Sequence, residues 1–332
     1  MDSWGEQLLP RSFDSVFYGA AGTPTGPFYA GGNRGLFMGG QTDFSNRTAS
    51  IDYIAIPTTG DASDFGDLSV ATAGMAAASN RSRGLSAGGN GGDGDQISYI
   101  TFSTTGNSTD FGNLQEARNQ PSGVSSKAGR GIFGGGYSTP DDARSDMIDY
   151  VAIATTGNAT DFGNLLAATE YASGCNDPTR GVFGLGVAGG SGGNVIQYIT
   201  MGTTGNASDF GDFVGTTLFQ SACASFEGRG VFSGGKGSGE LNRIQYITIA
   251  STGNATDFGD LTANSEGSGS ASNGTRATLA GGVDRNTIAY IAIGTTGNAT
   301  DFGDLSQVRP VSYTHLRAHE TVLDLVCRLL LE

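Results

Sequence analysis

The chain has 332 residues, of which 56 are Gly and only 15% are charged, and its formal net charge is −14. This Gly content without a three-residue period excludes collagen, and it disfavours long helices because each interior Gly costs a helix about 1 kcal/mol. The acidic balance disfavours nucleic-acid binding, since phosphate backbones are repelled. Neither a long apolar run nor a secretory signal pattern occurs, so we expect no membrane insertion.

Internal similarity divides the chain into three parts. Residues 1–21 are a leader or part of a closing strand, residues 22–309 hold six copies of one repeat, and residues 310–332 follow no repeat pattern. The copies recur about every 48 residues. In every copy a Tyr precedes the Phe of an Asp-Phe-Gly triplet by 12 residues; the six pairs are Tyr53 and Phe65, Tyr99 and Phe111, Tyr150 and Phe162, Tyr198 and Phe210, Tyr246 and Phe258, and Tyr290 and Phe302.

Each repeat predicts four short strands, which we name A to D in chain order. Strand A is made of small residues, as in 74–80, and strand B follows a recurrent Arg, as in 180–186. Strand C alternates apolar side chains on both faces, as in 51–56, which suits a sheet packed between two others. Strand D begins at the Asp-Phe-Gly triplet, as in 161–165, after a Thr-Gly-Asn turn in which Gly and Asn supply positive φ.

Four short strands per repeat are typical of propeller blades. We therefore predict an all-β fold, a β-propeller with six four-stranded blades, and the sequence leaves a seventh blade open. Because the triplet recurs at one phase, its Phe is expected to pack between blades and its Asp to close a turn, unlike the metal-binding triplet of kinases. The recurrent Arg of strand B is expected to make structural bonds, and a ring of charges around a channel is the alternative.

A double glycine follows strand B in five copies, as at Gly88 and Gly89, and a Tyr and then an aromatic residue on strand D come after it. This order resembles the kelch repeat, over the segment 22–308, and the resemblance implies a kelch-like propeller. The sequence departs from that pattern in two ways. Phe stands where kelch repeats usually have Trp, and the fourth copy reads Gly184, Leu185, Gly186. Kelch propellers serve many roles, so the resemblance implies no activity.

The recurrent amino-acid sequence of strands C and D also resembles that of repeat proteins encoded by marine bacteriophages. That resemblance implies a component of a virion or phage tail, located in a virion or outside the cell. It implies host surface glycans or virion proteins as partners.

Only the connection between strands B and C varies appreciably in length among the copies. Because strands alternate in direction, the B–C and D–A connections should emerge on one face, which we call the B–C face. Variable loops on a rigid scaffold are where binding usually evolves, and drift without a function is the alternative. The candidate binding residues on these loops are Asp43, Asn46, Asp93, Asp95, Tyr137, Asp141 and Asp142.

We predict a non-enzymatic structural or adhesion protein with no cofactor and no metal site. A secreted or surface bacterial binding propeller is one alternative, and a carboxylate-dependent glycan-active enzyme is another, although a catalytic pair should break the repeat symmetry. Asp93 and Asp95 resemble a fragment of a calcium loop that lacks its distal Glu. Cys175 and Cys223 occupy equivalent positions on strand A and are expected to be buried thiols.

Residues 310–332 contain both His residues of the chain, His315 and His319. The back-translation of this segment fits a transposase-type sequencing adapter, with Val322 and Leu323 where a sample index would stand. We interpret the segment as translated adapter, and a natural amphipathic helix is the alternative. On this interpretation the repeats contain no His, which disfavours catalysis by the commonest acid–base group and metal ligand.

Overall fold

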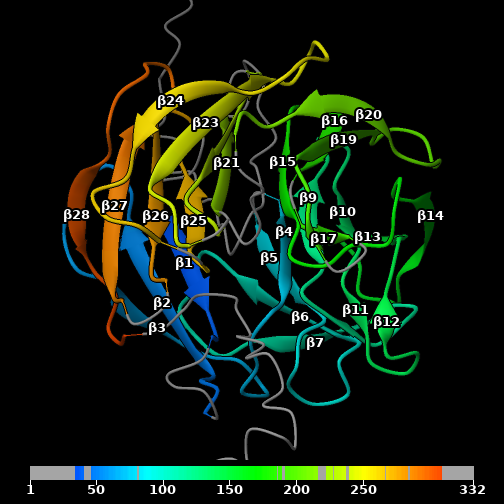
Figure 1. The fold of residues 1–332 in the computed structure, drawn as a ribbon. Helices are drawn as coiled ribbons and strands as arrows, with labels where there is room; N and C mark the ends of the chain where they lie inside the picture. The colour runs from blue at the N-terminus through cyan, green and yellow to red at the C-terminus, as the bar shows by residue number, and fades with distance from the viewer. Residues whose placement is uncertain are drawn as a thin grey trace, which may run out of the picture.

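All regular elements in the described part of the chain are β-strands (Figure 1). The computed structural model describes residues 34–40, 46–80, 82–184, 186–188, 191–215, 222–226, 228–236, 239–265, 267–282 and 285–308. The segments 1–21 and 310–332, for which we predicted a leader and an adapter-derived tail, lie outside these residues.

In the described part of the chain, six antiparallel sheets built from strands A to D follow one another, and we number them 1 to 6; two smaller sheets lie in the connections. Sheet 1 contains three described strands, β1 (Arg34–Met38), β2 (Ser50–Ala55) and β3 (Ser63–Asp67). Sheet 2 contains β4 (Ala76–Ser79), β5 (Arg83–Ala87), β6 (Gln96–Thr101) and β7 (Thr109–Asn113). Sheet 3 contains β9 (Ser122–Ser125), β10 (Arg130–Gly134), β13 (Met147–Ala152) and β14 (Thr160–Asn164).

Sheets 4 to 6 repeat this four-stranded order. Sheet 4 contains β15 (Ser173–Asn176), β16 (Arg180–Gly184), β19 (Val195–Thr200) and β20 (Ser208–Asp212). Sheet 5 contains β21 (Ala222–Phe226), β22 (Arg229–Ser233), β23 (Arg243–Thr248) and β24 (Thr256–Asp260). Sheet 6 contains β25 (Gly269–Ser272), β26 (Arg276–Ala280), β27 (Thr287–Ala292) and β28 (Thr300–Asp304).

The prediction of an all-β chain built from repeated four-stranded antiparallel sheets is confirmed. In sheets 2 to 6 the strands A to D lie side by side in chain order, which is consistent with propeller blades. The predicted ends differ by one or two residues, since β4 covers 76–79 of the expected 74–80 and β14 covers 160–164 where 161–165 was expected.

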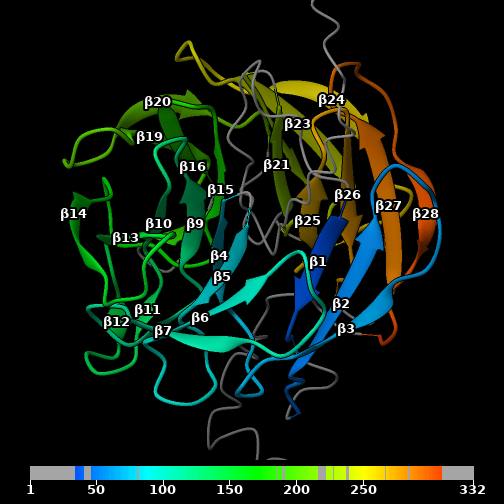
Figure 2. The same ribbon diagram turned by 180° about the vertical axis from the view of Figure 1, so that it is seen from behind.

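The sheets are arranged around a common centre in Figures 1 and 2, with the A strands innermost and the D strands outermost. Small side chains let the A strands approach one another closely. The backbone N–H of Ser79 donates to Ser125 Oγ at 2.8 Å, and that of Ser125 donates to Asn176 Oδ1 at 3.2 Å. Small polar residues of successive A strands therefore link sheets 2, 3 and 4 near the centre.

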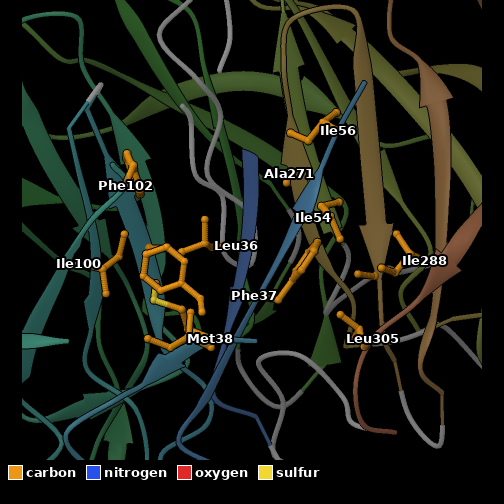
Figure 3. Packing of buried hydrophobic residues seen from close by; sticks show 14 of the residues in the cluster. Leu36, Phe37, Met38, Ile54, Ile56, Ile100, Phe102, Ala271, Ile288 and Leu305 are labelled. Carbon is orange, nitrogen blue, oxygen red and sulfur yellow. The ribbon is translucent and has the colours of Figure 1, made fainter. Parts of the chain in front are cut away.

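The apolar core lies between sheets rather than within one of them. One cluster joins Phe111 of sheet 2 to Phe133 and Val151 of sheet 3. A larger cluster joins sheet 1 to both sheet 2 and sheet 6, and Figure 3 shows Leu36 and Phe37 among its members. The structure buries all six triplet Phe side chains in clusters of this kind; their exposed fractions are 2% to 3%. Burying each ring contributes about 1.5–3 kcal/mol.

Each D strand is covered at its outer edge by the Thr-Gly-Asn turn of the next sheet. At the junction of sheets 1 and 2, Gly106 N donates to Phe65 O and Ser108 N donates to Asp67 O, both at 2.8 Å. Asn107 Oδ1 accepts a third bond from Asp67 N at 3.0 Å. These bonds recur at each junction from sheet 1 to sheet 6. They also join sheet 6 to sheet 1, where the donors and acceptors are Gly60 N to Phe302 O, Ala62 N to Asp304 O, and Asp304 N to Asp61 Oδ1.

Two expectations for this motif are wrong. The turn Asn does not adopt positive φ, because its side chain instead accepts the hydrogen bond from the neighbouring strand. The triplet Asp does not close a turn. Asp64, for example, lies exposed within β3, opposite Asp52 and next to a β-bulge.

The six recurrent Arg side chains join sheets on the face opposite the B–C face. Each guanidinium lies over the Tyr ring of its own sheet, with 4.1–4.8 Å from Cζ to the ring centroid. Each also donates to a carbonyl of the next sheet, as Arg34 does to Phe102 O at 2.8 Å and Arg276 does to Ile56 O at 3.1 Å. These bonds are structural, and their acceptors are carbonyl groups rather than repeated Asp residues.

Candidate binding face

The B–C connection of sheet 3 folds into a short hairpin. Its strands β11 (Tyr137–Ser138) and β12 (Ala143–Arg144) pair with each other, and β11 also pairs with β8 (Arg118–Asn119) from the D–A connection that precedes the sheet. The sequence predicted only a variable loop for the connection that carries Tyr137, Asp141 and Asp142. The pairing of β8 with β11 shows that B–C and D–A connections meet on one face here, as expected from the alternating strands.

Three predicted binding residues lie together on this hairpin. The Tyr137 hydroxyl donates to Asp142 Oδ1 at 2.6 Å, and this bond to a carboxylate is the main reason why the pKa of Tyr137 is raised above its ordinary value. Ser138 Oγ bonds Asp141 Oδ2 at 3.3 Å and accepts from Asp141 N at 3.2 Å. Both carboxylates are exposed. The hairpin therefore presents an oriented aromatic ring next to two carboxylates.

The other predicted residues lie on the B–C connections of sheets 1 and 2. Asn46 and Asp93 are exposed, and Asp95 Oδ2 accepts from Asn113 Nδ2 at 2.8 Å. Asp43 lies outside the described residues. No group of three His, Cys, Asp or Glu side chains suited to a metal ion occurs in the part of the chain that the structure describes.

Hydrogen bonds link these connections into one row across sheets 1 to 3. Arg47 Nε in the first loop donates to Asn90 Oδ1 in the second at 2.9 Å. Gly94 O in the second loop accepts from Arg118 N at 3.0 Å, and Arg118 begins β8, which pairs with the hairpin. The loops that carry the candidate residues are thus adjacent on the B–C face, although the structure does not gather their side chains into one pocket.

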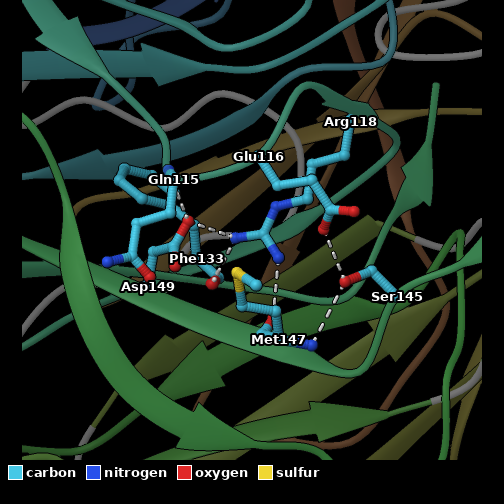
Figure 4. A network of polar contacts seen from close by, with 7 residues as sticks. All are labelled: Gln115, Glu116, Arg118, Phe133, Ser145, Met147 and Asp149. Atoms are coloured by element: carbon cyan, nitrogen blue, oxygen red, sulfur yellow. Dashed lines mark hydrogen bonds and ion pairs between the residues drawn. The ribbon is translucent and has the colours of Figure 1, made fainter. Parts of the chain in front are cut away.

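A buried ion pair that the sequence did not predict involves Arg118, which pairs with the hairpin through β8, and Figure 4 shows its contacts. Arg118 Nη2 lies 2.8 Å from Asp149 Oδ2, and both side chains are fully buried. The guanidinium also donates to Met147 O at 2.8 Å and Phe133 O at 3.3 Å. Burial raises the pKa of Asp149, although the attraction of Arg118 opposes that shift, and burial lowers the pKa of Arg118.

A second ion pair holds the hairpin to the D–A connection that follows sheet 3. Arg144 Nη2 lies 2.8 Å from Glu170 Oε1, and the Glu170 side chain is 2% exposed. Burial raises the pKa of Glu170 in spite of Arg144. Arg118 is an exception that can be seen in the sequence, because the equivalent position of other repeats holds a small residue, namely Thr72, Thr169 or Ser265. Nothing in the sequence indicated the pairing of Arg144 with Glu170.

Cys175 is fully buried on β15 within the cluster between sheets 4 and 5, as predicted. The side chain of Cys223 is not described. Among the described residues no helix could cross a membrane.

Comparison with known proteins leaves the family open. No protein-family model matches the chain, and no curated protein matches it either.

Proposed function

We propose that the six sheets are the blades of one closed, kelch-like β-propeller. The support is that the same three hydrogen bonds join sheet 6 to sheet 1 as join every other pair of neighbours. Small-angle X-ray scattering should give the profile of a closed disc, and the profile of an open arc would contradict the proposal.

We propose further that this propeller is a non-enzymatic binding protein of a phage virion or tail. Its B–C face would bind a host surface glycan or another virion protein. The observation that supports this role is a break in the repeat symmetry. The recurrent Tyr, Phe, Arg and Gly residues contact neighbouring sheets. The B–C connections of sheets 3 and 4 both form short hairpins, β11–β12 and β17 (Val187–Ala188) with β18 (Ser191–Gly192), and the break lies in the side chains, because only the first carries Tyr137, Asp141 and Asp142.

The chemistry of the hairpin suits a polyhydroxylated ligand. A Tyr ring offers an apolar face together with a polar hydroxyl, and ionised carboxylates accept hydrogen bonds from ligand hydroxyl groups. The contact between Tyr137 and Asp142 orients the ring before any ligand arrives, which lowers the entropic cost of binding. Glycan recognition is therefore the first arm of the proposal to test.

The test is a glycan array followed by titration of any glycan found, with wild-type protein and the variant Tyr137→Ala. We expect the variant to bind at least tenfold more weakly, because aromatic anchors dominate binding energies. Thr155→Ala, an exposed change directly before the Thr-Gly-Asn turn at the opposite face, is the matched control and should bind as the wild type does. Equal binding by Tyr137→Ala would exclude the hairpin, and turnover of the glycan would contradict the non-enzymatic role.

A further inference from the structure

On the B–C face, the repeat gives each junction between sheets a position equivalent to the one that Arg118 fills between sheets 2 and 3, and we call this position the slot. Two positions of the repeat shape the slot. One is the seventh residue after the triplet Phe, which is Arg118 at this junction, and the other is the residue before the recurrent Tyr, which is Asp149. The guanidinium is held there by the carboxylate and by the carbonyl groups of Phe133 and Met147.

At other junctions the side chain at the position of Asp149 accepts a bond from the residue four places after the triplet Phe, as Asp149 Oδ2 accepts from Gln115 N at 3.3 Å. Between sheets 3 and 4, Gln197 Oε1 accepts from Leu166 N at 2.8 Å, and between sheets 4 and 5, Gln245 Oε1 accepts from Val214 N at 2.8 Å. Between sheets 6 and 1, Asp52 accepts from Ser306 Oγ at 2.7 Å. The position of Asp149 therefore has a recurrent role, whereas the side chain at the position of Arg118 changes and is Thr72, Thr169 or Ser265 in other described sheets.

The slot between sheets 1 and 2 remains open. Its two determining residues are small, Thr72 and Ser98, and a cavity of about 10 Å³ lies between them, which is room for one water-sized group. A similar cavity of about 20 Å³ lies between sheets 5 and 6, where the equivalent residues are Ser265 and Ala289.

The open slot between sheets 1 and 2 has polar groups that the protein leaves without partners. Ser86 and Ser98 line it and are 4% and 6% exposed, and neither hydroxyl bonds any residue that the structure describes. An occupant with polar hydrogens would find two hydroxyl acceptors there. The carbonyl groups of Ser86 and Gln96 stand where those of Phe133 and Met147 hold the Arg118 guanidinium.

We propose that the slot lined by Thr72, Ser86, Gln96 and Ser98 binds a primary ammonium group. Two hydroxyl and two carbonyl oxygens offer four acceptors, and an ammonium group donates three hydrogen bonds whereas an alcohol donates one. The size of the cavity admits a single heavy atom with its hydrogens. The equivalent slot of the same chain already holds a cation, and the net charge of −14 favours cations near the surface. This inference does not depend on the glycan proposal.

The test titrates the full chain with methylammonium chloride and, separately, with methanol, which matches it in size without the charge. Amide chemical shifts of Gly88, Gly91 and Gln96 in NMR spectra report on the slot. We expect saturable shifts with methylammonium and none with methanol at the same concentrations. Saturation by both would overturn the assignment to an ammonium group, and no saturable shift with either would overturn the site.

Three variants locate the binding. Ser98→Asp places a carboxylate where Asp149 stands in sheet 3 and should tighten methylammonium binding at least tenfold, since it adds a charge-assisted hydrogen bond to the ammonium group. Ser98→Ala should weaken it severalfold. Ser103→Ala, an exposed change on the opposite face, is the control and should leave the affinity unchanged.

A double variant, Thr72→Arg with Ser98→Asp, recreates the Arg118–Asp149 pair and should close the slot. We expect it to lose methylammonium binding while it retains the strand signature in circular dichroism. Unchanged binding in this folded variant would overturn the proposal. If the double variant does not fold, the ratio of affinities between Ser98→Asp and Ser98→Ala decides, and equal affinities contradict the site.

Discussion

The Gly of each Asp-Phe-Gly triplet is required by the neighbouring sheet. At Gly163, φ is +146°, and a Cβ atom would lie 2.5 Å from the carbonyl oxygen of Gly205 in the next turn. Such a distance is far inside van der Waals contact, and positive φ is unfavourable for a residue with a side chain. The triplet thus ends in Gly because two backbones meet there.

Replacing this glycine should weaken the junction of sheets 3 and 4. We expect Gly163→Ala to lower the free energy of unfolding by about 2 kcal/mol or more, because strain and displacement of the turn act together. Urea unfolding followed by circular dichroism measures the change. Gly202→Ala is the control, since a Cβ atom there meets nothing within 4 Å, and its effect should stay within about 0.5 kcal/mol. Equal effects of the two changes would contradict the close approach.

At the scale of the element, the outer edge of each D strand is covered by the Thr-Gly-Asn turn of the next sheet. An uncovered outer strand would present unpaired N–H and C=O groups to other chains. In sheet 3, the outer edge of β14 is covered by backbone bonds from Gly205 and Ala207 and by the Asn206 side chain, whose Oδ1 accepts from Asn164 N at 3.0 Å. The neighbour's turn therefore acts as a short extra strand.

Removing the hydrogen bond between Asn206 Oδ1 and Asn164 N should lower the free energy of unfolding only modestly. We expect Asn206→Ala to destabilise the protein by about 0.5–1.5 kcal/mol, the usual net contribution of one hydrogen bond. Asn206→Asp keeps the acceptor and should cost less, because Asp61 has this role at the junction of sheets 6 and 1. The melting temperatures of both variants check the prediction. A larger loss for Asp than for Ala would show that the acceptor is unimportant.

The sequence predicted the positions of the strands better than it predicted the contacts between residues of different repeats. Alternating apolar residues and recurrent glycines place the four strands of a repeat to within two residues, since those signals are local. The part played by Asn206 was misread because its partner lies 42 residues away, in the preceding repeat. The hairpin β11–β12 was predicted as a loop because β8, which pairs with it, comes from another repeat. Arg118 and Asp149 were missed for the same reason, as they lie 31 residues apart.

At the scale of the whole molecule, the outer surface carries like charges. The triplet Asp residues are exposed on the outermost strand of all six sheets; they are Asp64, Asp110, Asp161, Asp209, Asp257 and Asp301. In sheets 1 and 3 a second Asp stands opposite on strand C, at Asp52 and Asp149. Like charges in these positions destabilise a sheet, and the net charge of −14 adds repulsion across the molecule.

Salt should therefore stabilise this protein. We expect the melting temperature to rise by a few degrees between low salt and about 0.5 M sodium chloride, because screening shortens the reach of repulsion. Differential scanning calorimetry measures the rise, and potassium chloride serves as a check on ion identity. The double variant Asp209→Asn with Asp257→Asn should show a smaller rise. A melting temperature that falls with salt would mean that attractive pairs outweigh the repulsion.

The same backbone bonds join every pair of neighbouring sheets, and this uniformity affects how the chain can gain or lose repeats and how it can misassemble. Every sheet offers the same turn to one neighbour and the same edge to the other, so the contacts themselves do not distinguish sheet 2 from sheet 5. The order of the sheets is then imposed by chain connectivity and by the few contacts that differ between junctions, such as the Arg118–Asp149 pair. A gene that gains or loses one whole repeat would still encode matching surfaces at every boundary. Two unfolded chains that refold together would likewise be able to exchange sheets. The product would be a domain-swapped dimer in which every junction is kept.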